Sequence, residues 1–142
     1  MRDTLTKEQR SALMSRMRGT NTAAERIIFE LLRRRRLSFT THSIGLPGRP
    51  DVAFESRRLA VFIDGDFFHG RGFQTWKHKL SLFWLEKISG NIRRDRRVDR
   101  RLWKTGWSVV HLWSRDVQRH PEKSLSRILR LRSARPLSRK KG

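Results

Sequence analysis

The sequence contains no cysteine, which excludes disulfide bonds and thiolate zinc sites and leaves the redox compartment open. It also has no hydrophobic run long enough to span a membrane, and its first residues form no apolar signal-peptide core. We therefore expect a monomeric protein of the cytoplasm that does not associate with membranes. Its 142 residues suit one compact domain at residues 1–132, followed by a flexible basic tail at residues 133–142.

Acidic residues are also scarce, because 13 Asp and Glu stand against 34 Lys and Arg and the net charge is +21. This excess predicts a polyanionic partner, since binding to phosphates releases their counterions and a guanidinium group can donate two hydrogen bonds to one phosphate. A solvated cationic surface or a disordered basic segment is the alternative. The hydrophobic content of 36%, with five Trp and eight Phe, instead favours a packed domain that binds nucleic acid.

Hydrophobic periodicity and turn residues predict the order helix, three strands, helix, strand, helix. The helices are expected at about residues 7–17 (a short one), 23–36 and 80–104, and after Pro121. The strands are expected at about residues 37–44, 51–54, 59–63 and 107–113. This order is similar to the common core of the PD-(D/E)XK nucleases, an α/β fold in which a mixed β-sheet of about four strands is flanked by helices.

Two acids stand at the ends of neighbouring predicted strands. Asp51 follows a turn rich in Gly and Pro, and Asp64 follows the strand at residues 59–63. If Arg57 and Arg58 form the tip of a tight hairpin, Asp51 lies opposite Asp64. Two carboxylates that meet in this way repel each other unless a cation binds between them, so we predict a site for one or two Mg²⁺ ions. The alternative for Asp51 is a carboxylate that only caps the turn.

Three more residues are candidates for the same site. His69 is the nearest group able to transfer a proton near neutral pH, although a lone histidine is usually structural. Asp95 lies on the apolar stripe of the predicted helix 80–104, where it could orient a histidine or a metal-bound water, or form an ion pair with an arginine. Glu25 has the spacing to complete a capping box with Thr22 and need do nothing else.

Several segments, taken together, resemble the very short patch repair (Vsr) endonucleases. They are Met14 to Glu25, Leu46 to Asp51, Phe62 to Gly70, and Phe83 to Ile88 with Asn91 and Arg94 to Arg97. The resemblance covers most of residues 10–115 in the same order. That family consists of bacterial Mg²⁺-dependent enzymes with a PD-(D/E)XK-like fold that nick one DNA strand beside a T:G mismatch.

The resemblance implies roles for the candidate residues. Asp51 would bind the metal with the main-chain carbonyl of Ile63, and His69 would transfer protons with support from Asp95. Glu25 would assist from the N-terminal helix. Asp64 stands where the type member has a second active-site histidine, so it either adds a metal-binding carboxylate or changes the proton relay.

The resemblance also implies how DNA is held. Phe67, Phe68 and Trp84 match the aromatic positions that intercalate beside the mismatch, although a Phe-Phe pair could equally belong to the core. The DNA-binding positions implied besides these are Arg49, Lys87, Asn91, Arg94 and Arg97. The expected partner is double-stranded, mismatched DNA in the bacterial nucleoid, together with mismatch-repair proteins.

The sequence departs from the family pattern at the structural zinc site. Its ligand positions here hold Asp66, Arg71, Phe73 and Arg115, so no zinc is expected. Phe68 also replaces a larger tryptophan. Three alternatives therefore stay open: a related nuclease with another recognition signal in restriction or phage defence, a non-catalytic DNA-binding protein of this fold, and an RNA-binding protein.

Overall fold

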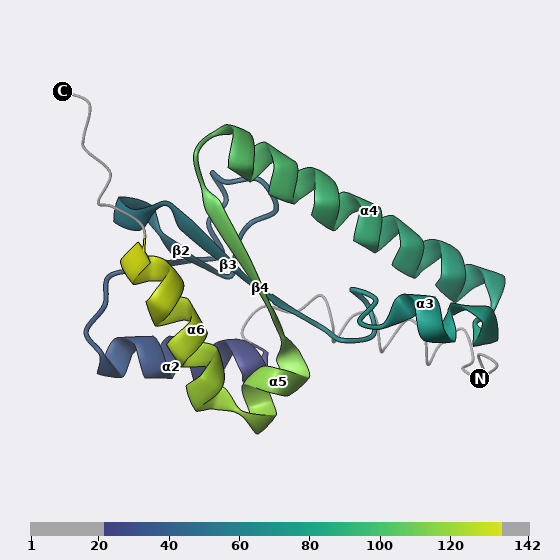
Figure 1. The fold of residues 1–142 in the computed structure, drawn as a ribbon, viewed down its shortest axis with the longest axis horizontal. Coiled ribbons are helices and arrows are strands. Elements are labelled where there is room, and N and C mark those ends of the chain that lie inside the picture. The colour runs from purple at the N-terminus through teal and green to yellow at the C-terminus, as the bar shows by residue number, and fades with distance from the viewer. Residues whose placement is uncertain (1–21, 135–142) are drawn as a thin grey trace.

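A four-stranded mixed sheet forms the centre of the computed structural model, which describes residues 22–134 (Figure 1). The strands are β1 (Thr40–Thr41), β2 (Val52–Phe54), β3 (Leu59–Asp64) and β4 (Ser108–Trp113), in that spatial order. β1, β2 and β3 pair antiparallel, and β4 pairs parallel to β3. The predicted mixed sheet is thereby confirmed. The predicted helix at about residues 7–17 lies outside the described residues. The predicted tail at residues 133–142 also lies outside them, except for residues 133 and 134, which belong to the last helix.

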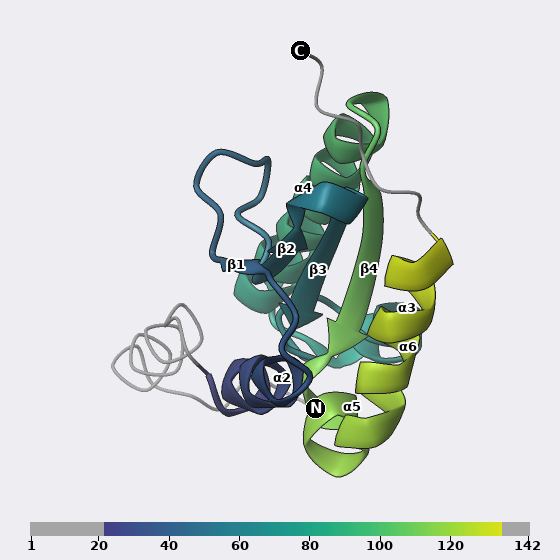
Figure 2. The same cartoon turned by 90° about the vertical axis from the view of Figure 1, so that its left-hand side faces the viewer.

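Helices cover both faces of this sheet. On one face lie α2 (Ala23–Arg34), α5 (Ser114–Arg119) and α6 (Pro121–Ala134), and on the other lies the 23-residue α4 (Leu82–Lys104), as Figure 2 shows. The short α3 (Phe73–Trp76) precedes α4. Within residues 22–134, no helix is both long and apolar enough to cross a membrane.

The alternation of side chains along β3 divides the core into two layers. Leu59, Val61 and Ile63 pack with the helices α2, α5 and α6. Ala60 and Phe62 pack with Leu102 of α4 in the second layer. Since successive side chains of a strand point to opposite faces, a strand buried on both sides reads as the continuous apolar run seen here. Each fully buried aliphatic side chain contributes roughly 1.5–3 kcal/mol to folding.

Capping signals in the sequence mark the start of α2 and the end of α4. The Thr22 hydroxyl accepts from the backbone N–H of Glu25 (3.3 Å), and the Glu25 carboxylate accepts from the N–H of Thr22 (2.7 Å). This capping box starts α2 where the sequence predicts it. Gly106 has φ +88° just beyond α4, a left-handed conformation that favours glycine at a helix end.

The predicted hairpin register was wrong by two residues. The connection between β2 and β3 is a 3₁₀ turn at Glu55–Arg57 followed by Arg58 in the left-handed region, and not a two-residue tip. Phe54 therefore pairs with Leu59 and Val52 with Val61. In this register Asp51 comes alongside Phe62, and Asp64 lies two residues further along β3. A shift of two residues keeps each side chain on its face of the sheet, so the error displaced the acids along the strand without separating them to opposite faces.

Three other segments differ from the predicted elements. The strand expected at residues 37–44 is only Thr40–Thr41, because the chain leaves the sheet at His42, whose φ is +47°. The segment between His69 and residue 80, for which no helix or strand is predicted, contains α3. The helix α5 was not predicted, because it follows β4 directly and no Gly or Pro marks the change from strand to helix.

Gly48→Ala is expected to destabilise the protein by on the order of 1–3 kcal/mol. Gly48 has φ +75°, and an added Cβ would lie 2.5 Å from Cγ1 of Val98 on α4. Gly45→Ala is the matched control, since a Cβ added there would have nothing within 4 Å and the φ of Gly45 is not left-handed. Urea unfolding of both variants measures the difference. Equal stabilities would contradict the prediction.

Candidate active site

The loop before β2 brings Asp51 to the end of β3. Its base is closed by backbone hydrogen bonds from His42 N–H to the Asp51 carbonyl (3.2 Å) and from Ser43 N–H to the Pro50 carbonyl (3.3 Å). Asp51 Oδ2 then accepts from the backbone N–H of Ile63 at 2.7 Å. The carboxylate thus occupies a hydrogen-bonding position that a longer β2 strand would otherwise fill.

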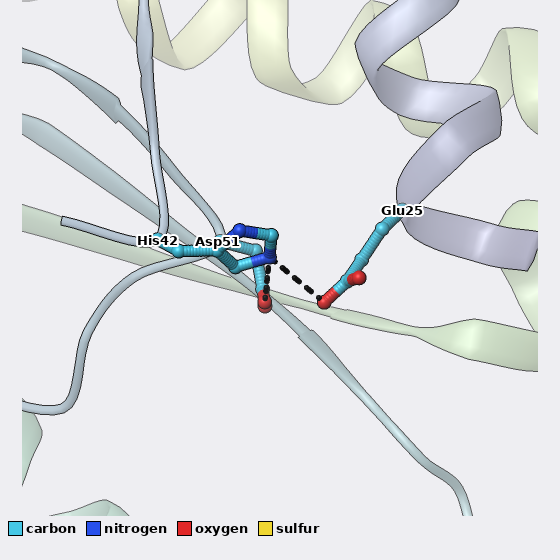
Figure 3. Close-up of side chains that lie close together, drawn as sticks. All are labelled: Glu25, His42 and Asp51. Atoms are coloured by element: carbon cyan, nitrogen blue, oxygen red, sulfur yellow. Dashed lines mark hydrogen bonds and ion pairs between the residues drawn. The ribbon is translucent and has the colours of Figure 1, made fainter. Parts of the chain in front are cut away.

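Glu25, His42 and Asp51 form a first cluster of possible metal ligands (Figure 3). His42 Nε2 lies 3.4 Å from Glu25 Oε1 and 3.8 Å from Asp51 Oδ1. Glu25 uses Oε2 for the capping box and Oε1 for His42, so it serves the helix and the cluster at once.

His42 is a site residue that sequence reasoning missed. The strand register could have indicated it, because extending the β1–β2 pairing by one residue pair from Thr41 and Val52 puts His42 next to Asp51. The expected strand at residues 37–44 lacked an assigned partner, so this neighbour was not identified.

The environment of Asp51 opposes its negative charge. Burial is the largest effect and, together with the Glu25 carboxyl and the charge of Asp64, raises the pKa of Asp51 to about 8, although the Ile63 N–H acts in the opposite direction. A buried carboxyl whose charged form is disfavoured by neighbouring acids is one that a bound cation would stabilise.

Asp64, His69 and Asp95 form a second cluster. His69 Nδ1 lies 2.6 Å from Asp95 Oδ2 and 3.9 Å from Asp64 Oδ1. Burial lowers the pKa of His69, but the hydrogen bond to Asp95 and the charges of Asp64 and Asp95 outweigh it, and the pKa is raised above its ordinary value. The short contact assigns the Nδ1 proton to the bond with Asp95, which leaves Nε2 available for other partners. Asp95 therefore pairs with a histidine rather than with an arginine.

Sequence reasoning also missed His111, which contacts Asp64, and Asp99, which contacts His111. His111 on β4 contacts Asp64 Oδ2 through Nδ1 at 2.6 Å and Asp99 Oδ1 through Nε2 at 2.7 Å. Burial lowers the pKa of His111, but the two carboxylates prevail and raise it to about 9. The sequence offered only a histidine inside an apolar strand, and no local pattern reveals that such a residue meets acids from two other elements.

The donor atoms present fit a hard divalent cation. Asp51 Oδ1 and Asp64 Oδ1 are carboxylate oxygens not used by the Ile63 or His111 hydrogen bonds. The N–H and carbonyl of a strand residue point to the same side, so the Ile63 carbonyl also faces the Asp51 side, beyond the last β2–β3 pair. Carboxylate and main-chain oxygens are the ligands that Mg²⁺ prefers.

Comparison with known proteins identifies the family. The sequence model of the family described as DNA mismatch endonuclease Vsr matches residues 2–75 of this chain. The chain is 40% identical over 116 residues to the type II nicking enzyme V.XorIIP of Xanthomonas oryzae pv. oryzae, covering 80% of this chain and 85% of that protein. It is 36% identical over 115 residues to the DNA mismatch endonuclease Vsr of Escherichia coli, covering 80% of this chain and 74% of that protein. The chain belongs to the Vsr family.

Membership of the Vsr family confirms the predicted resemblance and makes this protein a DNA endonuclease with a PD-(D/E)XK-like fold. It also speaks against the non-catalytic and RNA-binding alternatives. A further relative is the type II nicking enzyme V.NmeDIP of Neisseria meningitidis serogroup C, 36% identical over 118 residues, covering 81% of this chain and 80% of that protein. The family includes proteins named for mismatch cleavage and proteins named for nicking, so membership alone leaves the recognition signal open.

Four aromatic rings pack together beside the second cluster. Phe67 is 37% exposed and stacks on Trp76 at a centroid distance of 5.6 Å and an interplanar angle of 15°. Its edges meet Phe68 and Trp84, which are 8% and 2% exposed. Phe67 therefore offers the accessible ring, and Phe68 and Trp84 form its base.

The other predicted DNA-binding residues also include both exposed and buried side chains. Arg49, Arg94 and Arg97 are exposed, and Lys87 is half-buried. Asn91 is buried and donates from its side chain to the Phe68 carbonyl at 2.9 Å. In the structure Asn91 holds the aromatic segment against α4.

Ion pairs occupy the positions at which the family pattern has zinc ligands. Arg71 Nη1 lies 3.0 Å from Asp66 Oδ2 and 2.9 Å from Asp116 Oδ1. Asp66 Oδ1 also accepts from the backbone N–H of Arg115 at 3.0 Å. These contacts fasten the segment after His69 to the start of α5. Phe73, at another of these positions, is buried.

Asp51→Asn is expected to stabilise the metal-free protein relative to wild type, by an amount that grows as the pH rises from about 4 to about 8. The folded-state pKa of Asp51 is about 8 against an ordinary value of 3.8, so the folded protein retains a proton in this window that the unfolded chain has lost. Stability therefore falls with rising pH in the wild type. Asn has no such proton and can still accept from the Ile63 N–H.

Urea unfolding in EDTA at several pH values measures this difference. Glu30→Gln is the matched control, because Glu30 is exposed. A stability difference between Asp51→Asn and wild type that does not change with pH would contradict the prediction.

Proposed function

We propose that this endonuclease nicks one strand of double-stranded DNA at or beside T:G mismatches, with Mg²⁺ as cofactor, in DNA repair. The observation that carries the proposal is the convergence of Asp51 and Asp64 with the His69–Asp95 pair at one end of β3. Phosphodiester hydrolysis needs stabilisation of negative charge and a proton donor or acceptor, and this arrangement offers groups for both.

Asp51, Asp64 and the Ile63 carbonyl are the proposed metal ligands, with Glu25 supporting them beside His42. When bound, Mg²⁺ would neutralise charge on the phosphate and lower the pKa of a coordinated water. The raised pKa of Asp51 supports this assignment, because burial and the neighbouring Glu25 and Asp64 disfavour its negative charge and a bound cation would offset them.

His69 is the proposed proton-transfer residue. Its Nδ1 is held by Asp95 on the long helix α4, which fixes the ring and directs Nε2 away from that bond. The charge of Asp95 favours the protonated ring, so His69 can give a proton to a leaving oxygen as well as accept one from water.

Recognition of the DNA is assigned to the aromatic cluster and the arginines. Phe67 is the proposed ring that enters the base stack, with Phe68, Trp76 and Trp84 as its rigid support. Arg49, Arg94 and Arg97 are proposed to contact phosphates, with Lys87 beside them and Asn91 in support. The protein would act as a monomer in the bacterial cytoplasm, with mismatch-repair proteins as further partners.

A second function is favoured by the names of some relatives. Two of those described above are type II nicking enzymes, which supports a nickase with another recognition signal, associated with restriction. The two proposals differ in one measurable property. A mismatch enzyme nicks T:G duplexes much faster than matched duplexes, and the alternative enzyme does not.

Asp51→Asn is expected to abolish Mg²⁺-dependent nicking, and His69→Ala to lower its rate by about 10²- to 10⁴-fold. End-labelled matched and T:G duplexes incubated with each variant give both strands' cleavage rates. Glu30→Gln and His120→Gln, changes at exposed positions, should retain the wild-type rate. Wild-type protein that is folded and cuts neither duplex would refute the proposed function.

Phe67→Ala is expected to weaken binding to mismatched DNA by about 1–3 kcal/mol, because one base loses its stacking partner. Binding to matched DNA, which depends on phosphate contacts, should change little. Trp103→Ala removes an aromatic ring that is 57% exposed at the other end of α4 and is the control. Equal losses with matched and mismatched duplexes, measured by fluorescence anisotropy, would argue against a wedge.

A further inference from the structure

His111 lies between two carboxylates and contacts each with a different ring nitrogen. Nδ1 lies 2.6 Å from Asp64 Oδ2, and Nε2 lies 2.7 Å from Asp99 Oδ1. A carboxylate oxygen only accepts hydrogen bonds, so both ring nitrogens must donate, and only the imidazolium form carries both protons. His111 is therefore a fixed cation between Asp64 and Asp99.

Three elements hold this ring in place. His111 is on β4, in parallel register with Phe62 of β3, and the two rings stack at 5.0 Å with an interplanar angle of 14°. Asp99 comes from α4 on the same side of the sheet, where Phe62 packs against Leu102. The imidazolium of His111 is thus held by contacts from β3, β4 and α4, which restrict its rotation.

The contact with His111 decides which oxygen of Asp64 faces the catalytic cluster. Oδ2 is engaged by His111, and Oδ1 is the oxygen that lies 3.9 Å from His69 Nδ1. Asp64 is only 6% exposed, so loss of His111 would leave a largely buried carboxylate oxygen without this hydrogen bond. The cation also offsets repulsion between Asp64 and the acids on the opposite side, Asp51 and Asp95.

We propose that His111 and Asp99 are positioning residues of the active site: His111 orients and charge-balances Asp64, and Asp99 orients His111. The inference rests on the proposed role of Asp64 as a metal ligand. Asp99 acts only through His111, so its removal matters only while His111 is present. If the two residues made only core contacts, the loss of Asp99 would lower stability whether or not His111 was present.

Metal dependence tests the proposal. His111→Gln and Asp99→Asn are each expected to raise the Mg²⁺ concentration that half-saturates nicking by about 10- to 100-fold, while the KM for DNA stays near wild type. The double variant should be no worse than His111→Gln alone. His120→Gln is the matched control at an exposed histidine. Additive effects of the two changes, or a KM that rises with an unchanged Mg²⁺ requirement, would overturn the proposal.

Two readouts on the protein alone separate this inference from the proposed function. Histidine side-chain ¹⁵N NMR near neutral pH should show two protonated ring nitrogens for His111, of which the Nε2–H signal moves in Asp99→Asn. The rise in melting temperature on adding Mg²⁺ should shrink in both variants. A single protonated nitrogen refutes the inference even if the enzyme nicks DNA.

If wild type never nicks but these two results hold, the proposed function fails and the positioning of Asp64 stands. Should His111→Gln not fold, Asp99→Asn and its NMR signal decide the question, because Asn at this position keeps an oxygen that can accept from His111.

Discussion

The hydrogen bond from the Ile63 N–H to Asp51 is the contact on which the site depends. It joins the loop before β2 to the end of β3, and the other site residues arrive through elements attached to these two. Glu25 and His42 reach Asp51 from the α2 side, and Asp64 follows Ile63 directly. The loop is also held by its own closing hydrogen bonds and by Leu46, which packs against the layer formed with α4. The bond to Ile63 fixes the Asp51 carboxylate beside the strand that carries Asp64.

The electrostatics of the site follow a single pattern in a protein with net charge +21. Each of three histidines lies between two carboxylates: His42 between Glu25 and Asp51, His69 between Asp64 and Asp95, and His111 between Asp64 and Asp99. Most arginines within residues 22–134 are exposed, whereas Glu25, Asp51, Asp64 and Asp95 lie around the end of β3. Histidine suits the interior role because its flat ring can donate in two directions from a small volume. A DNA phosphate is therefore attracted by the positively charged surface around a site whose acids can bind a cation.

Local signals in the sequence predicted the parts of the fold that depend on neighbouring residues. The capping box at Thr22 and Glu25, the long helix α4 and the closing Gly106 all follow from patterns within a few residues. The inward position of Asp95 on α4 followed from helical periodicity. The hairpin register was wrong because the turn at Glu55–Arg57 has no Gly or Pro to define its length. His42 and His111 were missed because their partners come from other elements, and only the strand register brings those elements together.

The segment that carries His69 and Phe67 shows which forces can hold an active-site loop in the absence of cysteine. The Arg71 ion pairs with Asp66 and Asp116 are exposed, so water and dissolved ions weaken them. They mainly orient the segment and contribute little to its stability. The aromatic packing is less sensitive to solvent, because Phe68 and Trp84 are buried and each well-placed ring pair adds about 0.5–1.5 kcal/mol beyond its burial. Asn91 adds a buried hydrogen bond to the Phe68 carbonyl. The rings and Asn91 therefore carry most of the stabilisation, and the base beneath Phe67 also keeps His69 within reach of Asp95.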